Sequence, residues 1–229
     1  MKKVFVQTKN VQKFQSTMNA LNGRGDGVPG IALVFSEPGL GKTRTALWYC
    51  NQDNNAVFMR TIKLMTGRWM LEALVSELGE APAWKTADLF RQAVDQLMSR
   101  PRIVMIDEVD YLTYDARVIE TLRDLHDITG APFVFIGMDN ADRKLRRYRH
   151  LYDRFSEILK FAPLDRDDVK KVATELTDLT FTPDAIEWLT DNTRGMIRQL
   201  IIILYKAEKI ARLRSIKQIT SSELTGKRG

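Results

Sequence analysis

The sequence feature that most constrains this chain is VFSEPGLGKTRTAL at residues 34–47, where an apolar run gives way to a helical pattern through a glycine-rich turn. Glycines let backbone N–H groups converge on a phosphate, and the amino end of the following helix adds positive potential. The lysine can reach the β- and γ-phosphates, and the threonine hydroxyl can ligate Mg²⁺. We therefore predict a loop that binds ATP with Mg²⁺ through Ser36, Glu37, Pro38, Gly39, Leu40, Gly41, Lys42, Thr43 and Arg44.

One position departs from the G-x-x-x-x-G-K-[ST] pattern, because Ser36 stands where the first glycine is expected. That position mainly turns the strand into the loop, and Pro38 with Gly39 can supply the turn instead. Gly39 and Gly41 occupy the places where the backbone approaches the phosphates. We therefore expect the loop to bind phosphate despite the serine.

A second motif, RIVMIDEVDYL at residues 102–112, places two acids at the carboxyl end of an apolar strand. Ligands of open α/β sheets bind at this edge of the sheet. We expect Asp107 to hold Mg²⁺ together with Thr43, and Glu108 to orient and activate a water for attack on the γ-phosphate. The pair favours hydrolysis of ATP over transfer of its phosphate to a small molecule.

Short apolar, β-branched runs alternate with helical patterns over the first 162 residues. Strands that are apolar on both faces indicate a parallel sheet covered by helices on both sides. The expected strands are residues 31–35, 56–60, 102–106, 132–136 and 157–161. From residue 163 only helical patterns follow, and LIIILY at residues 200–205 is apolar enough to be buried. We predict an α/β domain at 1–162 and a small all-helical domain at 163–229.

Composition excludes several classes of protein. One cysteine rules out an internal disulfide, and two histidines with that cysteine make a zinc site unexpected. Apolar runs fall short of the roughly 20 residues needed to cross a bilayer, and the N-terminus lacks the apolar region of a signal peptide. We therefore expect a cytoplasmic protein without membrane contact.

Positive charge is concentrated in two places. Residues 194–229 carry nine Lys/Arg against two Asp/Glu, and RKLRRYRH at residues 143–150 forms a second basic cluster. Lys206, Lys209 and Arg212 recur every three residues and form one charged stripe on a predicted helix. Such clusters suit an anionic partner, nucleic acid above all, or else they are solvated helix faces.

Taken together, these motifs resemble those of AAA+ ATPases over nearly the whole chain. SEPGLGKT resembles Walker A, IVMIDE resembles Walker B, and PFVFIGMDN resembles the sensor 1 strand, with Asp139 or Asn140 as the polar sensor. LYDRF resembles the arginine-finger box, in which Arg154 fits best, and NTRGMIRQL resembles sensor 2 with Arg198. The resemblance implies a P-loop NTPase (AAA+) fold with a parallel five-stranded sheet flanked by helices and a helical lid. It also implies a homo-oligomer, because the finger acts on the nucleotide of a neighbouring subunit. The alternative finger residues are Arg146, Arg147 and Arg149.

Within AAA+ proteins, the compact size and the short helix at residues 11–21 before the P-loop strand resemble the DNA-transposition ATPases of the MuB/TnsC type. The resemblance implies an ATP-dependent ring or helical filament on double-stranded DNA that recruits or regulates a transposase and disassembles on hydrolysis. Hydroxyl and basic groups just beyond the second strand suit phosphate contacts without sequence readout. We assign these contacts to Thr61, Lys63, Thr66, Arg68 and Lys85, and we interpret Trp69 and Trp84 as packing residues.

Two other functions are compatible with the motifs. A helicase- or origin-loading ATPase would be expected to carry an additional winged-helix or partner module. A nucleotide switch or secretion-type ATPase would act on proteins, and it would assemble with ATP without affinity for DNA. Salt-dependent DNA binding that needs ATP distinguishes the transposition-type function from the protein-directed one.

Overall fold

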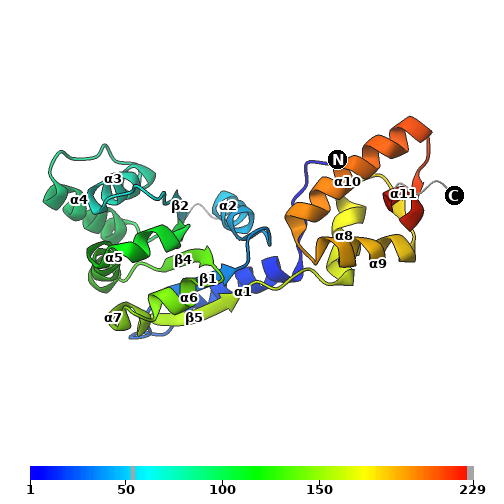
Figure 1. Cartoon of the computed structure of the whole chain (residues 1–229). Helices are drawn as coiled ribbons and strands as arrows, with labels where there is room; N and C mark the ends of the chain where they lie inside the picture. The colour runs from blue at the N-terminus through cyan, green and yellow to red at the C-terminus, as the bar shows by residue number, and fades with distance from the viewer. Residues whose placement is uncertain (53–54, 226–229) are drawn as a thin grey trace. The chain divides into compact units, whose positions relative to one another are not determined.

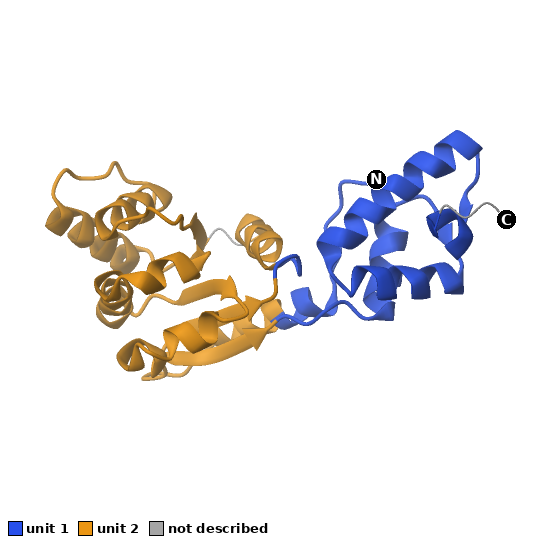
Figure 2. Cartoon of the chain, viewed as in Figure 1, with its two compact units in different colours: residues 1–13, 38–41, 161–229 blue, residues 14–37, 42–160 orange. Residues whose placement is uncertain are grey.

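The computed structural model describes residues 1–52 and 55–225, so that Lys227 and Arg228 of the basic C-terminal segment lie outside the described residues. The chain divides into two compact units (Figure 2). One unit, called the α/β unit below, comprises residues 14–37 and 42–160. The other, called the helical unit, comprises residues 1–13, 38–41 and the chain from residue 161 onward.

The α/β unit is built on a five-stranded sheet (Figure 1). The strands are β1 (Ile31–Ser36), β2 (Ala56–Arg60), β3 (Ile103–Asp107), β4 (Phe133–Met138) and β5 (Phe155–Lys160). Every neighbouring pair is parallel, and the order is β2-β3-β4-β1-β5, which confirms the predicted fold class.

The burial of each strand follows from its place in the sheet. All five residues of β3 are buried, because helices cover both faces of a central parallel strand. Phe133 and Phe135 of β4 are fully buried in the same core. The edge strand β5 alternates between exposed and partly buried residues. The core therefore lies under the middle strands, and it holds their carboxyl ends in fixed positions.

The helices of the α/β unit lie between the strands in sequence, as predicted. The longer ones are α2 (Lys42–Gln52), α3 (Gly67–Glu77), α4 (Thr86–Ser99) and α5 (Ala116–Thr129). Helix α5 begins where the Asp115 carboxylate accepts from the Arg117 N–H, and it ends at Gly130, whose φ of 66° is left-handed. Three short helices were not predicted: η1 (Val109–Tyr114), α6 (Ala141–Leu145) and α7 (Arg149–Tyr152).

The C-terminal part of the helical unit contains α8 (Arg166–Leu176), α9 (Pro183–Thr193), α10 (Ile197–Arg214) and α11 (Ser221–Thr225). The Asp165 side chain caps α8, and Pro183 occupies the first turn of α9, as the sequence predicts. The expectation of helices alone needs a correction. Two short strands, β6 (Thr180–Phe181) and β7 (Gln218–Ile219), form a parallel pair in this unit because their backbone groups satisfy each other.

The first thirteen residues also belong to the helical unit, although the sequence places them with the α/β domain. The Lys2 N–H donates to the Leu176 carbonyl at 2.8 Å. Asn10, near the start of α1 (Lys9–Asn22), donates to and accepts from the backbone of Ala162, at 2.7 and 3.0 Å. Val6 is buried in the core of the unit. These pairings join residues more than 150 positions apart, which local patterns do not reveal.

The burial predicted for LIIILY is wrong in part. Leu200 and Leu204 are fully buried, whereas Ile202 is 43% exposed and Tyr205 is 52% exposed. Helix α10 therefore packs through one face only. Among the described residues, no helix is both long enough and apolar enough to cross a membrane.

Candidate active site

All five parallel strands of the α/β unit end at one edge of the sheet, and the last residues of four of them define the candidate site. Ser36, Arg60, Asp107 and Met138 end β1, β2, β3 and β4 respectively. Because all the strands are parallel, these ends share the carboxyl edge, where α/β proteins bind ligands.

The glycine-rich loop begins directly after β1 and leads into α2. Gly39 and Gly41 have φ angles of 90° and 95°, a left-handed conformation that side chains disfavour. Both predicted glycines are therefore required by the backbone. Ser36 is the last residue of an extended strand and is fully buried, so its position does not need a glycine. This explains physically why the pattern tolerates a serine there.

The Lys42 ammonium group is held by the loop itself. It donates to the Ser36 hydroxyl at 2.8 Å, to the Ser36 carbonyl at 3.0 Å and to the Glu37 carbonyl at 3.2 Å. Burial lowers the pKa of Lys42, and the negative charge of Asp107 opposes that shift. A partly desolvated ammonium group held by neutral oxygens is well suited to exchange them for charged phosphate oxygens.

Thr43 and Asp107 bring two hard oxygens together. The Thr43 hydroxyl donates to the Asp107 carboxylate at 2.8 Å, and the Asp107 residue is only 2% exposed. Burial raises the pKa of Asp107, while the hydrogen bond from Thr43 opposes that shift. Hydroxyl and carboxylate oxygens are the ligands that Mg²⁺ prefers in proteins, so the pair fits that ion.

Glu108 stands in an unusual backbone conformation, with φ 59° and ψ 35°. Non-glycine residues in this left-handed region carry strain, and such residues cluster at functional sites. Its carboxylate accepts from the Arg60 guanidinium at 3.0 Å. Thr61 fixes the backbone, because its hydroxyl donates to the carbonyls of Glu108 at 2.6 Å and Asp107 at 3.0 Å.

The roles of Arg60 and Thr61 at this edge were not predicted. Thr61 is buried and its hydroxyl is used inside the protein, so its assignment to DNA contacts is wrong. Arg60 pairs in register with Asp107 across the β2–β3 ladder. The position of Arg60 as the last residue of the second strand is therefore the sequence feature from which its place beside Asp107 could be predicted.

The two sensor 1 candidates differ in their surroundings. The Asp139 carboxylate forms an ion pair with Lys160 at 2.8 Å. Asn140 precedes α6, and its side chain makes no capping hydrogen bond with that helix. A third acid, Asp110, was missed: it is buried and accepts from the Met138 N–H at 2.6 Å, which holds the end of β4.

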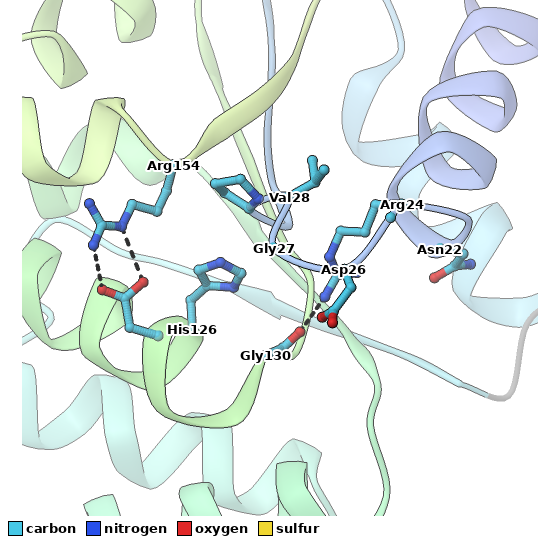
Figure 3. Close-up of a pocket in the computed structure, with 11 residues that line it drawn as sticks. Asn22, Arg24, Asp26, Gly27, Val28, His126, Gly130 and Arg154 are labelled. Carbon is cyan, nitrogen blue, oxygen red and sulfur yellow. Dashed lines mark hydrogen bonds and ion pairs between the residues drawn. The ribbon is translucent and has the colours of Figure 1, made fainter.

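Arg154 lies at the opposite, amino edge of the sheet, directly before β5. Its guanidinium binds both carboxylate oxygens of Asp127, at 2.9 and 3.2 Å (Figure 3). It also donates to the His150 carbonyl. Arg146 pairs with Asp142 at 3.0 Å. Arg147 and Arg149 are exposed, and the described residues show no ion pair for either. The four candidate finger arginines therefore differ in their ion pairs: Arg154 and Arg146 each have an acidic partner, and among the described residues Arg147 and Arg149 show none.

A cavity of about 530 Å³ lies beside Arg154 (Figure 3). His126 is buried there between two backbone groups, with its ring nitrogens 2.8 Å from the Ala131 carbonyl and 3.2 Å from the Gly30 N–H. Arg24 donates to the carbonyls of Leu21 and Gly130. The cavity is not evident from the sequence, because its lining comes from three separate segments.

Arg198 begins α10 in the helical unit. Its backbone N–H donates to the Gly39 carbonyl at 3.1 Å, and its side chain is exposed. Residues 38–41 and α10 belong to the same unit, so the predicted sensor 2 arginine lies on the helix that contacts the glycine-rich loop.

The residues assigned to DNA contacts lie after β2 and before α4. Lys63 and Lys85 are exposed. Thr66 caps α3 by accepting from the Trp69 N–H at 3.2 Å, and Arg68 pairs with Glu72 at 2.8 Å. The packing role expected for Trp84 is wrong, because this side chain is 85% exposed, with the Arg68 guanidinium 5.6 Å from its ring centre.

Comparison with known proteins gives one family match. A family model described as AAA domain matches residues 26–145. The chain is 31% identical over 180 residues to the ATP-dependent target DNA activator B of Escherichia phage D108, and equally to that of Escherichia phage Mu. Each alignment covers 74% of this chain and 55% of the phage protein, so the chain spans about half the length of these relatives.

Solved structures resemble the chain in fold. The ORC2 protein of Aeropyrum pernix matches with a TM-score of 0.74 at 15% identity, covering 98% of this chain and 69% of that one. The RuvB Holliday junction branch migration motor of Thermotoga maritima matches with a TM-score of 0.63 at 21% identity, covering 97% and 68%. At these identities the likeness speaks for the fold alone.

Proposed function

This chain belongs to the AAA domain family and is an ATPase, and from that premise we propose that it assembles on double-stranded DNA with ATP and regulates a transposase. The observation that carries the proposal is the 31% identity to phage proteins named ATP-dependent target DNA activator B. The geometry of the carboxyl edge supports the ATP-dependent part.

We assign phosphate binding to residues 36–44. Lys42 leaves the Ser36 and Glu37 oxygens and binds the β- and γ-phosphates, because charged oxygens form the stronger hydrogen bonds. The backbone N–H groups around Gly39 and Gly41 surround the β-phosphate. Thr43 and Asp107 would hold Mg²⁺, and the ion would neutralise charge on the phosphate oxygens.

Glu108 is the proposed general base. It accepts a proton from the attacking water as the water oxygen bonds to the γ-phosphorus and the bond to the β-bridging oxygen breaks, which yields ADP and phosphate. The ion pair with Arg60 holds the carboxylate at 3.0 Å in the resting chain. Arg60 therefore has to release Glu108 before the carboxylate can accept the proton.

Three further residues complete the proposed site. Asn140 is the preferred polar sensor, because Asp139 is neutralised by Lys160. Arg198 reports bound phosphates to the helical unit, which we propose acts as a lid from residue 163 onward. Arg154 stabilises charge on the γ-phosphate of a neighbouring copy, since it lies at the amino edge of its own sheet.

Duplex DNA is bound through Lys63, Thr66, Arg68 and Lys85. Lysine and arginine contacts to phosphates carry no sequence information, which suits a protein that accepts many target sites. The exposure of Lys63 and Lys85 supports this assignment.

The test uses Glu108→Gln, a variant that should bind ATP and hydrolyse it about a hundredfold more slowly or worse. With ATP, it should form stable assemblies on duplex DNA of unrelated sequences, seen by electron microscopy and by fluorescence anisotropy.

Removing Lys63, Arg68 and Lys85 together should weaken DNA binding and reduce the salt dependence of the affinity. Lys13→Ala, which removes an exposed lysine from α1, is the matched control. Assembly with ATP but without DNA affinity would exclude the transposition function in favour of a protein-directed ATPase.

A further inference from the structure

Several side chains on the outward face of α10 do not pack into the core of the helical unit. We call this face the outer stripe, and its members are Ile202, Tyr205, Lys206, Lys209, Arg212 and Leu213. All six are exposed, and Leu213 is 87% exposed. At 100° per residue these positions fall on one side of the helix.

The opposite side of α10 already supplies its packing. Leu200, Leu204, Ala207 and Ala211 are buried and lie about half a turn away from the outer stripe. The helix is therefore fully anchored without Ile202, Tyr205 or Leu213. Apolar side chains lined up on an exposed face at a spacing of three and four residues are typical of a second helix–helix contact.

The charge of the stripe is of one sign. Lys206, Lys209 and Arg212 contribute three positive charges, and α10 contains one acid, Glu208. That acid is turned away from the stripe: its side chain is 13% exposed and accepts from the N-terminal ammonium group of Met1 at 2.5 Å. Of the three stripe cations, Arg212 forms an ion pair with Glu208 at 3.8 Å, and the described residues show no ion pair for Lys206 or Lys209.

The cations and the apolar groups form one surface. The Lys209 ammonium lies 4.8 Å from the centre of the Tyr205 ring, so the two side chains hold each other over the helix. A partner thus meets ordered side chains and loses less conformational freedom on binding.

We propose that the outer stripe docks an acidic amphipathic helix of another protein. Leucine- or isoleucine-type side chains of that helix would cover Ile202, Tyr205 and Leu213, and its carboxylates would pair with Lys206, Lys209 and Arg212. The stripe spans 11 residues, so it accommodates about three turns of a partner helix. The charges alone would suit DNA, but phosphates gain nothing from covering aliphatic side chains. The apolar members of the stripe therefore favour a protein partner.

This inference is independent of the proposed action on DNA, because it depends only on α10 and its contacts. None of the six stripe residues is assigned to the active site or to DNA, and Arg198 lies on the same side of α10 about one turn before Ile202. Variants in the outer stripe should leave basal ATP hydrolysis unchanged, and that measurement serves as the check on folding.

The experiment measures binding of a fluorescein-labelled peptide of about 18 residues by anisotropy. The peptide has leucine at helical spacings of three and four and glutamate on the flanking positions. A scrambled peptide of the same composition and a fluorescein-labelled DNA duplex are the comparison probes. The full chain should bind the amphipathic peptide at least about tenfold more tightly than the scrambled one.

Two variants separate packing from charge. Ile202→Ser combined with Leu213→Ser should abolish the preference for the amphipathic peptide, and Lys209→Glu should weaken its binding about tenfold. The matched controls are Met98→Ser, an exposed apolar residue of α4, and Lys170→Glu, an exposed lysine of α8, and neither should change binding.

Equal binding of both peptides, or no binding of either, overturns the proposal. If the stripe variants leave peptide binding unchanged and lower the affinity for the DNA duplex, the outer stripe is a nucleic-acid surface and the protein partner is excluded.

Discussion

The two edges of the sheet in the α/β unit make a useful comparison. At the carboxyl edge, polar side chains satisfy one another over short distances: Lys42 with Ser36, Thr43 with Asp107, and Arg60 with Glu108. At the amino edge, Arg154 pairs with Asp127, and the His126 ring forms hydrogen bonds with the Ala131 carbonyl and the Gly30 N–H. Side chains are held by hydrogen bonds at both edges, and the two edges differ in their distance from a nucleotide bound at the glycine-rich loop.

The length of the strands separates the two edges of the sheet. β1 has six residues, so its two ends are about 20 Å apart. A side chain at the amino edge therefore cannot contact a nucleotide bound at the carboxyl edge of the same sheet. If Arg154 acts on a phosphate, that phosphate belongs to another copy of the chain. The proposed roles of the two edges therefore differ: the carboxyl edge would bind the nucleotide, and the amino edge would reach a nucleotide only on a neighbouring copy.

The largest expected effect is at Lys42. Lys42→Ala should abolish nucleotide binding, because it removes the ammonium group that the glycine-rich loop holds at 3.2 Å or less from Ser36 and Glu37 oxygens. Binding of a fluorescent ATP analogue measures the effect. Lys13→Ala is the control, and a Lys42 variant with normal affinity would contradict the assignment of the loop.

Arg154→Ala should slow hydrolysis in the assembled state about a thousandfold while leaving nucleotide affinity unchanged. A mixture with Glu108→Gln tests whether the arginine acts across subunits. In a head-to-tail assembly, equal amounts of the two variants create about a quarter of interfaces with both groups intact, so activity should return in part. Arg147→Ala and Arg149→Ala are the comparison variants. Loss of activity in one of these, with Arg154→Ala active, would assign the finger elsewhere.

A smaller effect is expected at Arg60. Arg60→Ala frees the Glu108 carboxylate from a partly exposed ion pair, so basal turnover should rise about two- to fivefold, in line with the modest strength of such pairs. Steady-state hydrolysis without DNA provides the measurement, with Arg68→Ala as control. Unchanged turnover would mean that Arg60 does not restrain Glu108.

The smallest effect concerns His126 and pH. Burial lowers the pKa of His126 in the folded chain, so unfolding takes up a proton as the pH falls below the ordinary value of 6.5. The stability that this residue contributes is complete above that pH and is lost as the pH falls toward the lowered value, by at most about 1.4 kcal/mol per pH unit. Urea unfolding between pH 5 and 7.5 measures the slope. His126→Gln should flatten it, and His150→Gln, at an exposed site, should not.

Much of the site could be predicted because its signals are local. The order strand, glycine-rich loop, lysine and helix is contiguous, and Asp107 with Glu108 follows directly on an apolar strand. Arg60 and Asp110 could not be predicted in the same way. Arg60 matters because β2 lies beside β3, and Asp110 matters because its carboxylate reaches the end of β4. Both contacts depend on the order of strands in the sheet.

Local sequence patterns specify the chemistry of the loop and the alternation of strands and helices, because glycine conformation and apolar periodicity act over a few residues. Which acid holds which arginine, as with Arg154 and Asp127, depends on the folded chain, and so does the exposure of some apolar residues of α10. Pairing and burial are set by segments that meet from distant parts of the chain, and a local pattern carries no record of those meetings.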